Sequence, residues 1–181
     1  MPGYKHTPTA MLSDEIALNT ITVSSASKTF NIAGLSSAYL IIRNKELMAK
    51  YNHFMQATHI SSGNFFGLVA TEAAYTFGTE WLTQLIEYLS SNYRLIEQFF
   101  SENIPLIKVM EPEGTYLVWI DLSNTGIEPR LAYKKLIDAG VGVSPGFLFG
   151  TGGENYIRIN IGCPQSLLIK ALERFKTVFP K

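Results

Sequence analysis

The sequence predicts a soluble chain of the α/β class, built as two successive parts. Short β-branched or apolar runs lie at residues 20–24 and 38–42, and a long amphipathic segment covers residues 80–100. After Pro105 the pattern returns to short alternating strands mixed with helices. Of the 181 residues, 46% are hydrophobic, which is enough for one sizeable core or for two small lobes.

Charge and cysteine usage narrow the classes of function. The 15 Lys and Arg balance the 15 Asp and Glu, so neither nucleic acid nor a membrane surface is expected as a partner. The single cysteine, Cys163, excludes an internal disulfide framework, and no Cys/His grouping has zinc spacing, so no metal site is expected. No stretch reaches the roughly 18 apolar residues of a spanning helix, and residues 1–12 show no targeting signal. We therefore expect a cytoplasmic protein.

Two buried strands are predicted at residues 20–24 and 38–42, because both runs are short, apolar and bounded by turn-forming residues. The segment between them, residues 25–37, is too short for a crossover helix of the usual length. Lys28 is therefore expected on an exposed loop that joins two neighbouring strands.

Residues 45–103 are predicted to be helical, with Asn52 or Ser62 as possible N-caps. Within residues 80–100 the apolar side chains fall three and four positions apart, which predicts one buried stripe. Its members are Trp81, Leu82, Leu85, Ile86, Leu89, Tyr93, Ile96 and Phe100. Pro105 ends this helix, because proline lacks a backbone donor and restricts the residue before it.

The remainder is predicted to be a small α+β lobe. Gly140 fits the C-terminal end of one helix and Pro164 the first turn of the next. Strands are expected within residues 106–110, 114–123, 141–146 and 156–162, and helices at 129–140 and 164–179. We therefore expect two domains, residues 1–104 and residues 105–181.

Lys28 lies in a run of small hydroxyl residues that extends from Ser24 to Thr29. A lysine is almost wholly protonated at neutral pH, since its ordinary pKa is about 10.4, and burial or a nearby cation is needed to make it a nucleophile or a base. Loop hydroxyls and backbone donors bind phosphate groups. The combination indicates pyridoxal phosphate (PLP), and the alternative is a solvated loop lysine.

Arg158, in YIRINIGCP, is the second candidate. Its guanidinium is permanently charged and matches a carboxylate with a planar fork, although a strand arginine can also be a surface residue or pair with an acid of its own chain. Cys163 has no histidine or acid near it in sequence, so we expect a packing role. Tyr116 and Trp119 lie on an alternating strand and are expected to pack in the lobe core.

Several segments together resemble the fold-type I PLP enzymes of the class I/II aminotransferase superfamily, and in particular its carbon–sulfur lyases of the cystathionine β-lyase type. These segments are SSASKTFNIAGL, TEAAYTFGTEWLTQLIEYLSSNY, EGTYLVWIDL, GVSPGFLFG and RINIGCP, and they extend through nearly all of the chain. The resemblance implies the C-terminal portion of such an enzyme: the end of the large-domain sheet, a long connecting helix and a small α+β domain.

The resemblance also implies roles for individual residues. It marks Lys28 as the lysine that forms the internal aldimine with PLP and acts as the base. Ser25 and Ser27 become candidates for contact with the cofactor phosphate. Arg158, followed by Asn160 and Gly162, matches the R-x-N-x-G pattern whose arginine holds the α-carboxylate of the substrate.

Two departures from the family pattern shape the expectation. Many aminotransferases have an arginine soon after the cofactor lysine, whereas this chain has none before Arg43, which favours the lyase branch. Family members are also roughly double this length. The glycine-rich phosphate turn, the aromatic residue that stacks on the cofactor and the acid that pairs with its ring nitrogen would lie in the part that is absent.

We therefore expect the C-terminal fragment of a PLP-dependent carbon–sulfur β-lyase that acts on amino acids, inactive by itself and not necessarily able to bind PLP. Whether the chain alone is an enzyme stays open. An aminotransferase is one alternative, and a non-catalytic dimerisation module is another. Exposed strand edges and apolar surface would favour a homodimer.

Overall fold

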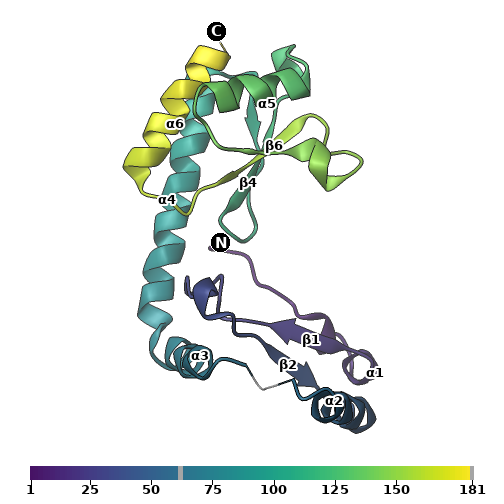
Figure 1. Ribbon diagram of the computed structural model, residues 1–181. Coiled ribbons are helices and arrows are strands. Elements are labelled where there is room, and N and C mark those ends of the chain that lie inside the picture. Colours follow the sequence, from purple (N-terminus) through teal and green to yellow (C-terminus); the bar gives the residue numbers. More distant parts are fainter. Residues whose placement is uncertain (61–62, 180–181) are drawn as a thin grey trace. The chain divides into compact units, whose positions relative to one another are not determined.

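The computed structural model describes residues 1–60 and 63–179, which form two compact units (Figure 1). Unit 1 comprises Met1–Tyr4 and Leu85–Lys181, and unit 2 comprises Lys5–Gln84. The division falls inside a long helix, whereas the boundary expected from the sequence lay at residue 104. It falls there because the second part of the helix contributes its buried residues to the core of unit 1.

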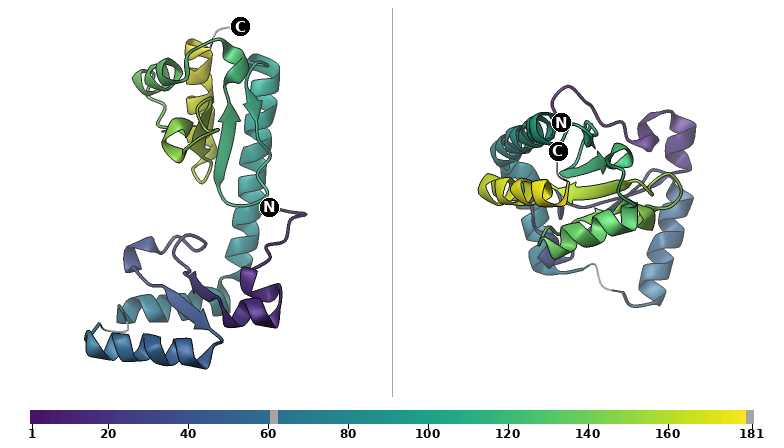
Figure 2. Two further views of the ribbon diagram at one scale, coloured as in Figure 1. Left: turned by 90° about the vertical axis from the view of Figure 1, so that its right-hand side faces the viewer. Right: turned by 90° about the horizontal axis from the view of Figure 1, so that it is seen from above.

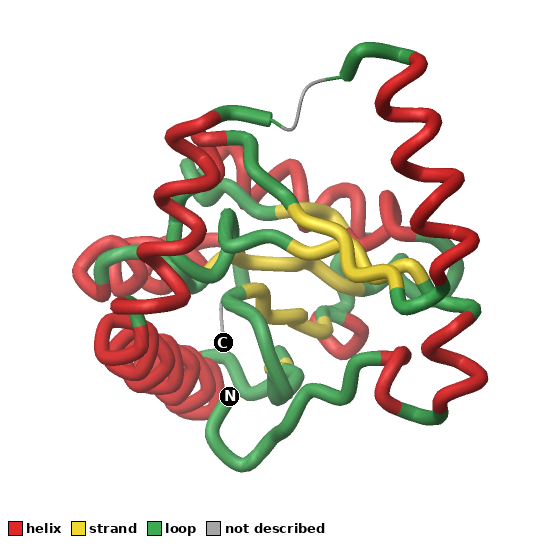
Figure 3. The backbone as a smooth tube through the Cα atoms, turned by 90° about the horizontal axis from the view of Figure 1, so that it is seen from below, coloured by secondary structure: helices red, strands yellow, loops and turns green. Residues whose placement is uncertain are grey.

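Unit 2 contains a two-stranded sheet, and helices precede and follow its strands in the sequence. The elements are η1 (Thr9–Met11), α1 (Asp14–Leu18), β1 (Ile21–Ser24), η2 (Ala33–Leu35), β2 (Tyr39–Ile42), α2 (Lys45–Ala57), α3 (Phe65–Phe77) and the start of α4 (Thr79–Asn103). Strands β1 and β2 are antiparallel, with Ser24 opposite Tyr39 (Figures 1 and 3). The predicted strand–loop–strand arrangement around Lys28 is confirmed.

The prediction that both strands are buried is wrong. Val23 is 68% exposed and Ile41 is 54% exposed, and in the described part of unit 2 the buried hydrophobic residues are only Ala17, Ala26 and Ile42. No described segment covers the faces of this sheet well enough to bury them. The two apolar runs therefore predicted the strands correctly, but they did not predict how little of each strand other segments cover.

The helix N-caps are also different from those predicted. Asn44 caps α2, its Oδ1 accepting from the backbone N–H of Glu46 at 2.9 Å, and Asn64 caps α3 in the same way. Asn52 lies inside α2, and Ser62 is outside the described residues. An asparagine at a cap satisfies backbone donors that the first turn leaves free.

Unit 1 is the predicted α+β lobe joined by most of α4. Its other elements are β3 (Lys108–Val109), β4 (Leu117–Asp121), η3 (Ser123–Thr125), α5 (Pro129–Asp138), β5 (Ser144–Pro145), η4 (Gly146–Phe149), β6 (Tyr156–Asn160) and α6 (Gln165–Val178). The four strands are antiparallel in the order β3-β4-β6-β5, and α5 contacts α6 (Figure 2). None of the described helices is long and apolar enough to cross a membrane.

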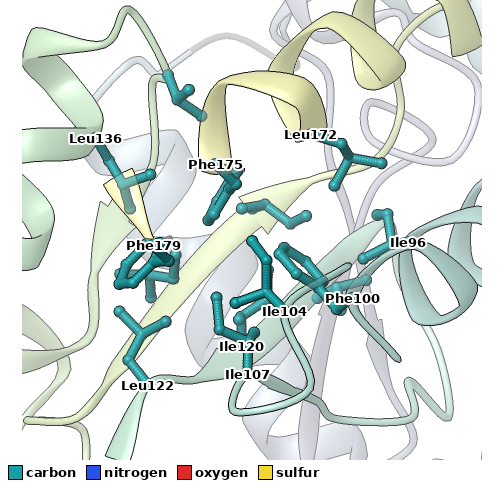
Figure 4. Close-up of a cluster of buried hydrophobic side chains, with 14 of the residues drawn as sticks. Ile96, Phe100, Ile104, Ile107, Ile120, Leu122, Leu136, Leu172, Phe175 and Phe179 are labelled. Atoms are coloured by element: carbon teal, nitrogen blue, oxygen red, sulfur yellow. The ribbon is translucent and has the colours of Figure 1, made fainter. Parts of the chain in front are cut away.

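One continuous core holds unit 1 together (Figure 4). Alternate residues of β4 and β6, such as Val118 and Ile157, are buried and meet side chains from α4, α5 and α6. The rings of Phe100 and Phe175 pack edge to face at 5.2 Å between centroids. From Leu89 onwards the predicted stripe on α4 belongs to this core, with Leu89, Ile96 and Phe100 buried and Tyr93 half-buried. Trp81 is 45% exposed because it precedes the part of the helix that joins this core.

Candidate functional site

Lys28 is an exposed residue in the turn that follows β1. The turn is held by two backbone hydrogen bonds, in which Phe30 N–H donates to the Ala26 carbonyl at 2.9 Å and Ile32 N–H donates to the Ser27 carbonyl at 3.0 Å. Ala26 is 1% exposed and anchors the turn in unit 2. Rigid neighbours therefore present the amine of Lys28 to solvent.

The second half of this loop lies tightly against α3. Asn64 Nδ2 donates to the Leu35 carbonyl at 3.2 Å, and Ser27 Oγ donates to the Ser37 carbonyl at 3.4 Å. A Cβ atom at Gly67 would collide with Ser37 and with the Leu35 carbonyl, so glycine is required for this approach. Both ends of the Lys28 loop are consequently fixed.

Aromatic side chains support the same loop. The ring of Phe30 meets Tyr75 edge to face at 5.5 Å and lies 5.9 Å from Trp81. The hydroxyls of Tyr39 and Tyr75 are hydrogen-bonded at 3.0 Å. Bonding to Ser24 and then to Tyr75 lowers the pKa of Tyr39, whereas the bond to Tyr39 raises the pKa of Tyr75. The hydrogen bond between the two hydroxyls ties β2 to α3.

An open cavity of about 380 Å³ lies between β2 and α3. Its lining is mostly apolar and includes Leu68, Thr71, Glu72 and Tyr75. The carboxylate of Glu72 would repel a phosphate group. This cavity is therefore a poor match for a phosphorylated ligand.

Arg158 lies on β6, opposite Trp119 of β4 and Ser144 of β5. Its Nη2 donates to Ser144 Oγ at 3.5 Å, and its Nε is buried without a partner among the described residues. Between described residues the ion pairs are Arg43–Asp14 and Lys176–Glu173, so no carboxylate of this part of the chain neutralises Arg158. A half-buried guanidinium without an ionic partner is suited to bind a carboxylate.

Aromatic residues surround Arg158 on the sheet face that points away from the core. The guanidinium carbon lies 4.4 Å from the centre of the Phe149 ring, and Trp119 meets Phe149 edge to face at 5.1 Å. A cavity of about 360 Å³ lies beside them, between Met110, Trp119, Phe149 and Tyr156. Trp119, which we expected in the core, belongs to this face because it alternates with the buried Val118 and Ile120.

The chain after Arg158 is fastened to α4 by two side chains. Asn92 is fully buried, and its Nδ2 donates to the carbonyls of Ile161 at 2.9 Å and Cys163 at 3.1 Å. Tyr88 Oη accepts from the Gln165 backbone N–H at 2.7 Å. These bonds fix the end of the strand that carries Arg158.

Cys163 is half-buried and packs against the core, as its sequence context predicted. Burial raises the pKa of its thiol, which disfavours the reactive thiolate. The described residues contain no group of three or more His, Cys, Asp or Glu that could hold a metal ion.

Comparison with known proteins identifies the family. Residues 3–175 match the family model described as aminotransferase class I and II. The chain belongs to this family. It is 39% identical over 175 residues to cystathionine β-lyase PatB of Bacillus subtilis, covering 96% of this chain and 45% of PatB. It is 35% identical over 152 residues to the protein MalY of Escherichia coli, covering 83% of this chain and 39% of MalY. The chain spans about half the length of the curated family members it matches.

Solved structures of the family show the same fold. A PLP-bound putative aminotransferase from Clostridium difficile 630 matches with a TM-score of 0.93 and 40% identity, over 99% of this chain and 46% of that one. Cystalysin from Treponema denticola, which contains PLP, matches with a TM-score of 0.89 and 34% identity, over 98% of this chain and 45% of that one. The predicted fold class, a portion of a fold-type I PLP enzyme, is confirmed.

The four predicted site residues fall in both units. Ser25, Ser27 and Lys28 lie together on one loop of unit 2, and Arg158 lies on the sheet of unit 1. The sequence reasoning missed Phe149, whose contact with Arg158 depends on the fold of η4. The alternation within the two central strands was the available signal, but it places residues on a shared face only when the strand register is known.

Proposed function

We propose that this chain carries the cofactor lysine and the substrate-binding arginine of a PLP-dependent carbon–sulfur β-lyase of the cystathionine β-lyase type, which acts on amino acids. The observation that carries the proposal is Lys28, exposed on a serine-rich and rigidly held loop. Support comes from family members with that activity in their names, such as PatB at 39% identity.

The residues of the Lys28 loop fit PLP by their chemistry. Lys28 supplies a primary amine that no described acid pairs with, and the half-buried Ser25 and Ser27 supply hydroxyl donors for a phosphate. PLP, when bound, supplies an electron sink for the carbanion that forms at the substrate Cα.

Each residue would then have a defined task. Lys28 would hold the cofactor, and once the substrate amine has replaced it, its free Nζ would take the proton from the substrate Cα. Arg158 holds the α-carboxylate through Nη1 and Nη2, because its Nε is buried. Ser25 would donate a hydrogen bond to the phosphate, and Ser27 would do so by exchanging its 3.4 Å bond to the Ser37 carbonyl for one to the phosphate. Departure of a thiolate from the substrate Cβ completes the elimination.

An aminotransferase is the second candidate for the catalytic function. It is supported by the family description and by the 40% identical structure from Clostridium difficile, whose title names a putative aminotransferase. Both candidates use Lys28 and Arg158 in the same binding roles. Pyruvate release from cystathionine, measured against amino-group transfer to a 2-oxo acid, separates them.

A non-catalytic dimerisation module is a candidate of a different class. Unit 2 exposes several large apolar side chains. Three of them, Phe65, Phe66 and Phe77, are 71–81% exposed and support association with a second copy. We propose a cytoplasmic homodimer that is inactive, or nearly so, when only these residues are present. The single free cysteine is consistent with a reducing compartment.

The test is the visible absorption spectrum of the chain mixed with PLP. We expect an absorption band that borohydride bleaches, and we expect Lys28→Ala to lose it. Lys45→Ala removes another exposed lysine at the start of α2 and should leave the band unchanged. An equal band in Lys28→Ala would refute the assignment of Lys28. No band in either protein would leave the dimerisation module as the better account of these residues.

A further inference from the structure

We propose that Phe149 is a positioning residue that holds the guanidinium of Arg158 in the orientation in which it binds a carboxylate. The inference rests on the carboxylate-binding role proposed for Arg158. Phe149 does not touch the substrate in this proposal. It acts through the arginine alone.

The first support is the stacking geometry. The guanidinium carbon of Arg158 lies over the face of the Phe149 ring at 4.4 Å from its centre, within the range in which a cation is attracted to an aromatic ring. The ring itself packs in a T-shaped contact with Trp119, with 5.1 Å between centroids, and Trp119 in turn meets Tyr156 at 6.1 Å. A fixed chain of rings therefore defines the plane on which the guanidinium rests.

The second support is the set of nitrogens left available. Within residues 1–60 and 63–179, Nε of Arg158 is buried without a partner, and Nη2 makes only a long hydrogen bond of 3.5 Å to Ser144 Oγ. A carboxylate must therefore approach the terminal nitrogens. Phe149 on one face and Ser144 beside Nη2 limit the rotation of the group, which reduces the entropy lost on binding.

The choice of an aromatic residue also has a chemical reason. An acidic residue could orient the guanidinium equally well, but it would compete with the carboxylate of the ligand for the same donors. A ring face attracts the cation and leaves every N–H free. Among the described residues no acid forms an ion pair with Arg158.

Unit 1 contains a matched control for this contact. The guanidinium of Arg130 lies 4.3 Å from the centre of the Phe147 ring, and Phe147 belongs to the same short element, η4, as Phe149. Arg130 is exposed on α5 and has no part in the proposed site. Phe147→Leu therefore removes an equivalent stacking contact from the same segment.

The experiment follows the Nε–H signal of Arg158 by NMR in the ¹⁵N-labelled 181-residue chain without PLP, assigned by its loss in Arg158→Lys. L-methionine is the carboxylate probe. We expect it to shift the signal, and we expect Phe149→Leu to weaken its apparent affinity roughly five- to tenfold and to speed exchange of the Nε proton with water. Phe149→Tyr keeps the ring face and should restore both, while Phe147→Leu should change neither.

The outcomes separate this inference from the proposed function. Equal affinity in wild type and Phe149→Leu would refute the positioning role and leave the carboxylate role of Arg158 intact. No shift of the Arg158 signal with L-methionine in wild type would refute both. If Phe149→Leu does not fold by circular dichroism, Phe149→Met provides the same comparison, since Phe149 is 48% exposed and tolerates a flexible apolar side chain.

Discussion

Replacing Asn92 by alanine should destabilise unit 1 more than any other single polar substitution on α4. Asn92 is 0% exposed, and its side chain joins α4 to the segment that follows Arg158. The substitution removes both hydrogen bonds of Nδ2. It leaves the carbonyl of Ile161 buried, whereas the carbonyl of Cys163 keeps a weaker bond of 3.4 Å from Tyr88 Oη.

The size of the effect follows from these contacts. An unpaired buried carbonyl costs about 1–3 kcal/mol, and the loss of the second hydrogen bond costs about 1 kcal/mol. The Oδ1 atom of Asn92 is buried and has no hydrogen-bond partner in the part of the chain that the structure describes. Its removal returns roughly 1 kcal/mol. We therefore expect the free energy of unfolding to fall by about 2 kcal/mol.

The assay is urea unfolding followed by tryptophan fluorescence. The chain has two tryptophans, Trp119 in unit 1 and Trp81 in unit 2, so a Trp81→Phe background reports unit 1 alone. With a slope of about 2 kcal/mol per molar urea, Asn92→Ala should shift the midpoint down by about 1 M. The control is Asn103→Ala, which removes a partly buried bond within α4, from Nδ2 to the Phe99 carbonyl. A shift no larger than that of the control would refute the reasoning.

Three further predictions concern other parts of the chain. Gly78→Ala places a Cβ against the Ala74 carbonyl and the ring of Phe30, and should lower the stability of unit 2 by about 1–3 kcal/mol, measured by Trp81 fluorescence. Gly34→Ala, whose Cβ would meet no described atom within 4 Å, should stay near neutral. Burial, and then the charge of nearby glutamates, raises the pKa of Tyr93 to about 12. The unfolded chain loses this proton near pH 10, so the free energy of unfolding should fall between about pH 10 and pH 12. Urea midpoints measured across that range should fall with pH in the wild type and change less with pH in Tyr93→Phe. Cys163, whose pKa burial raises, should react with iodoacetamide more slowly in the folded chain than in urea, as mass spectrometry would show.

The sequence predicts well those features that depend on local pattern. The two runs that flank Lys28 became strands, and the stripe on α4 from Leu89 to Phe100 became part of the core. Gly140 has a φ of +74°, which explains why the chain turns there after α5. Each of these depends on residues close together in the chain.

Features that depend on tertiary context were not predictable in this way. The exposure of Val23 could not be read from an apolar run, since burial depends on what covers the strand. Asn52 and Asn44 are both plausible caps by composition, and only the actual start of α2 decides between them. The Arg158–Phe149 contact joins a strand to a short 3₁₀ element whose path no local pattern specifies.

The two sheets differ in how their edges are protected, and this has a consequence for handling the protein. In unit 1 the edge strands β3 and β5 have two residues each, and Pro145 removes a backbone donor from β5. In unit 2 both β1 and β2 are edge strands within the described chain, and they carry exposed Val23 and Ile41. Aggregation during expression should therefore begin in unit 2. Lysine substitutions at Val23 or Ile41 are the changes that would reduce it while leaving the core of unit 1 untouched.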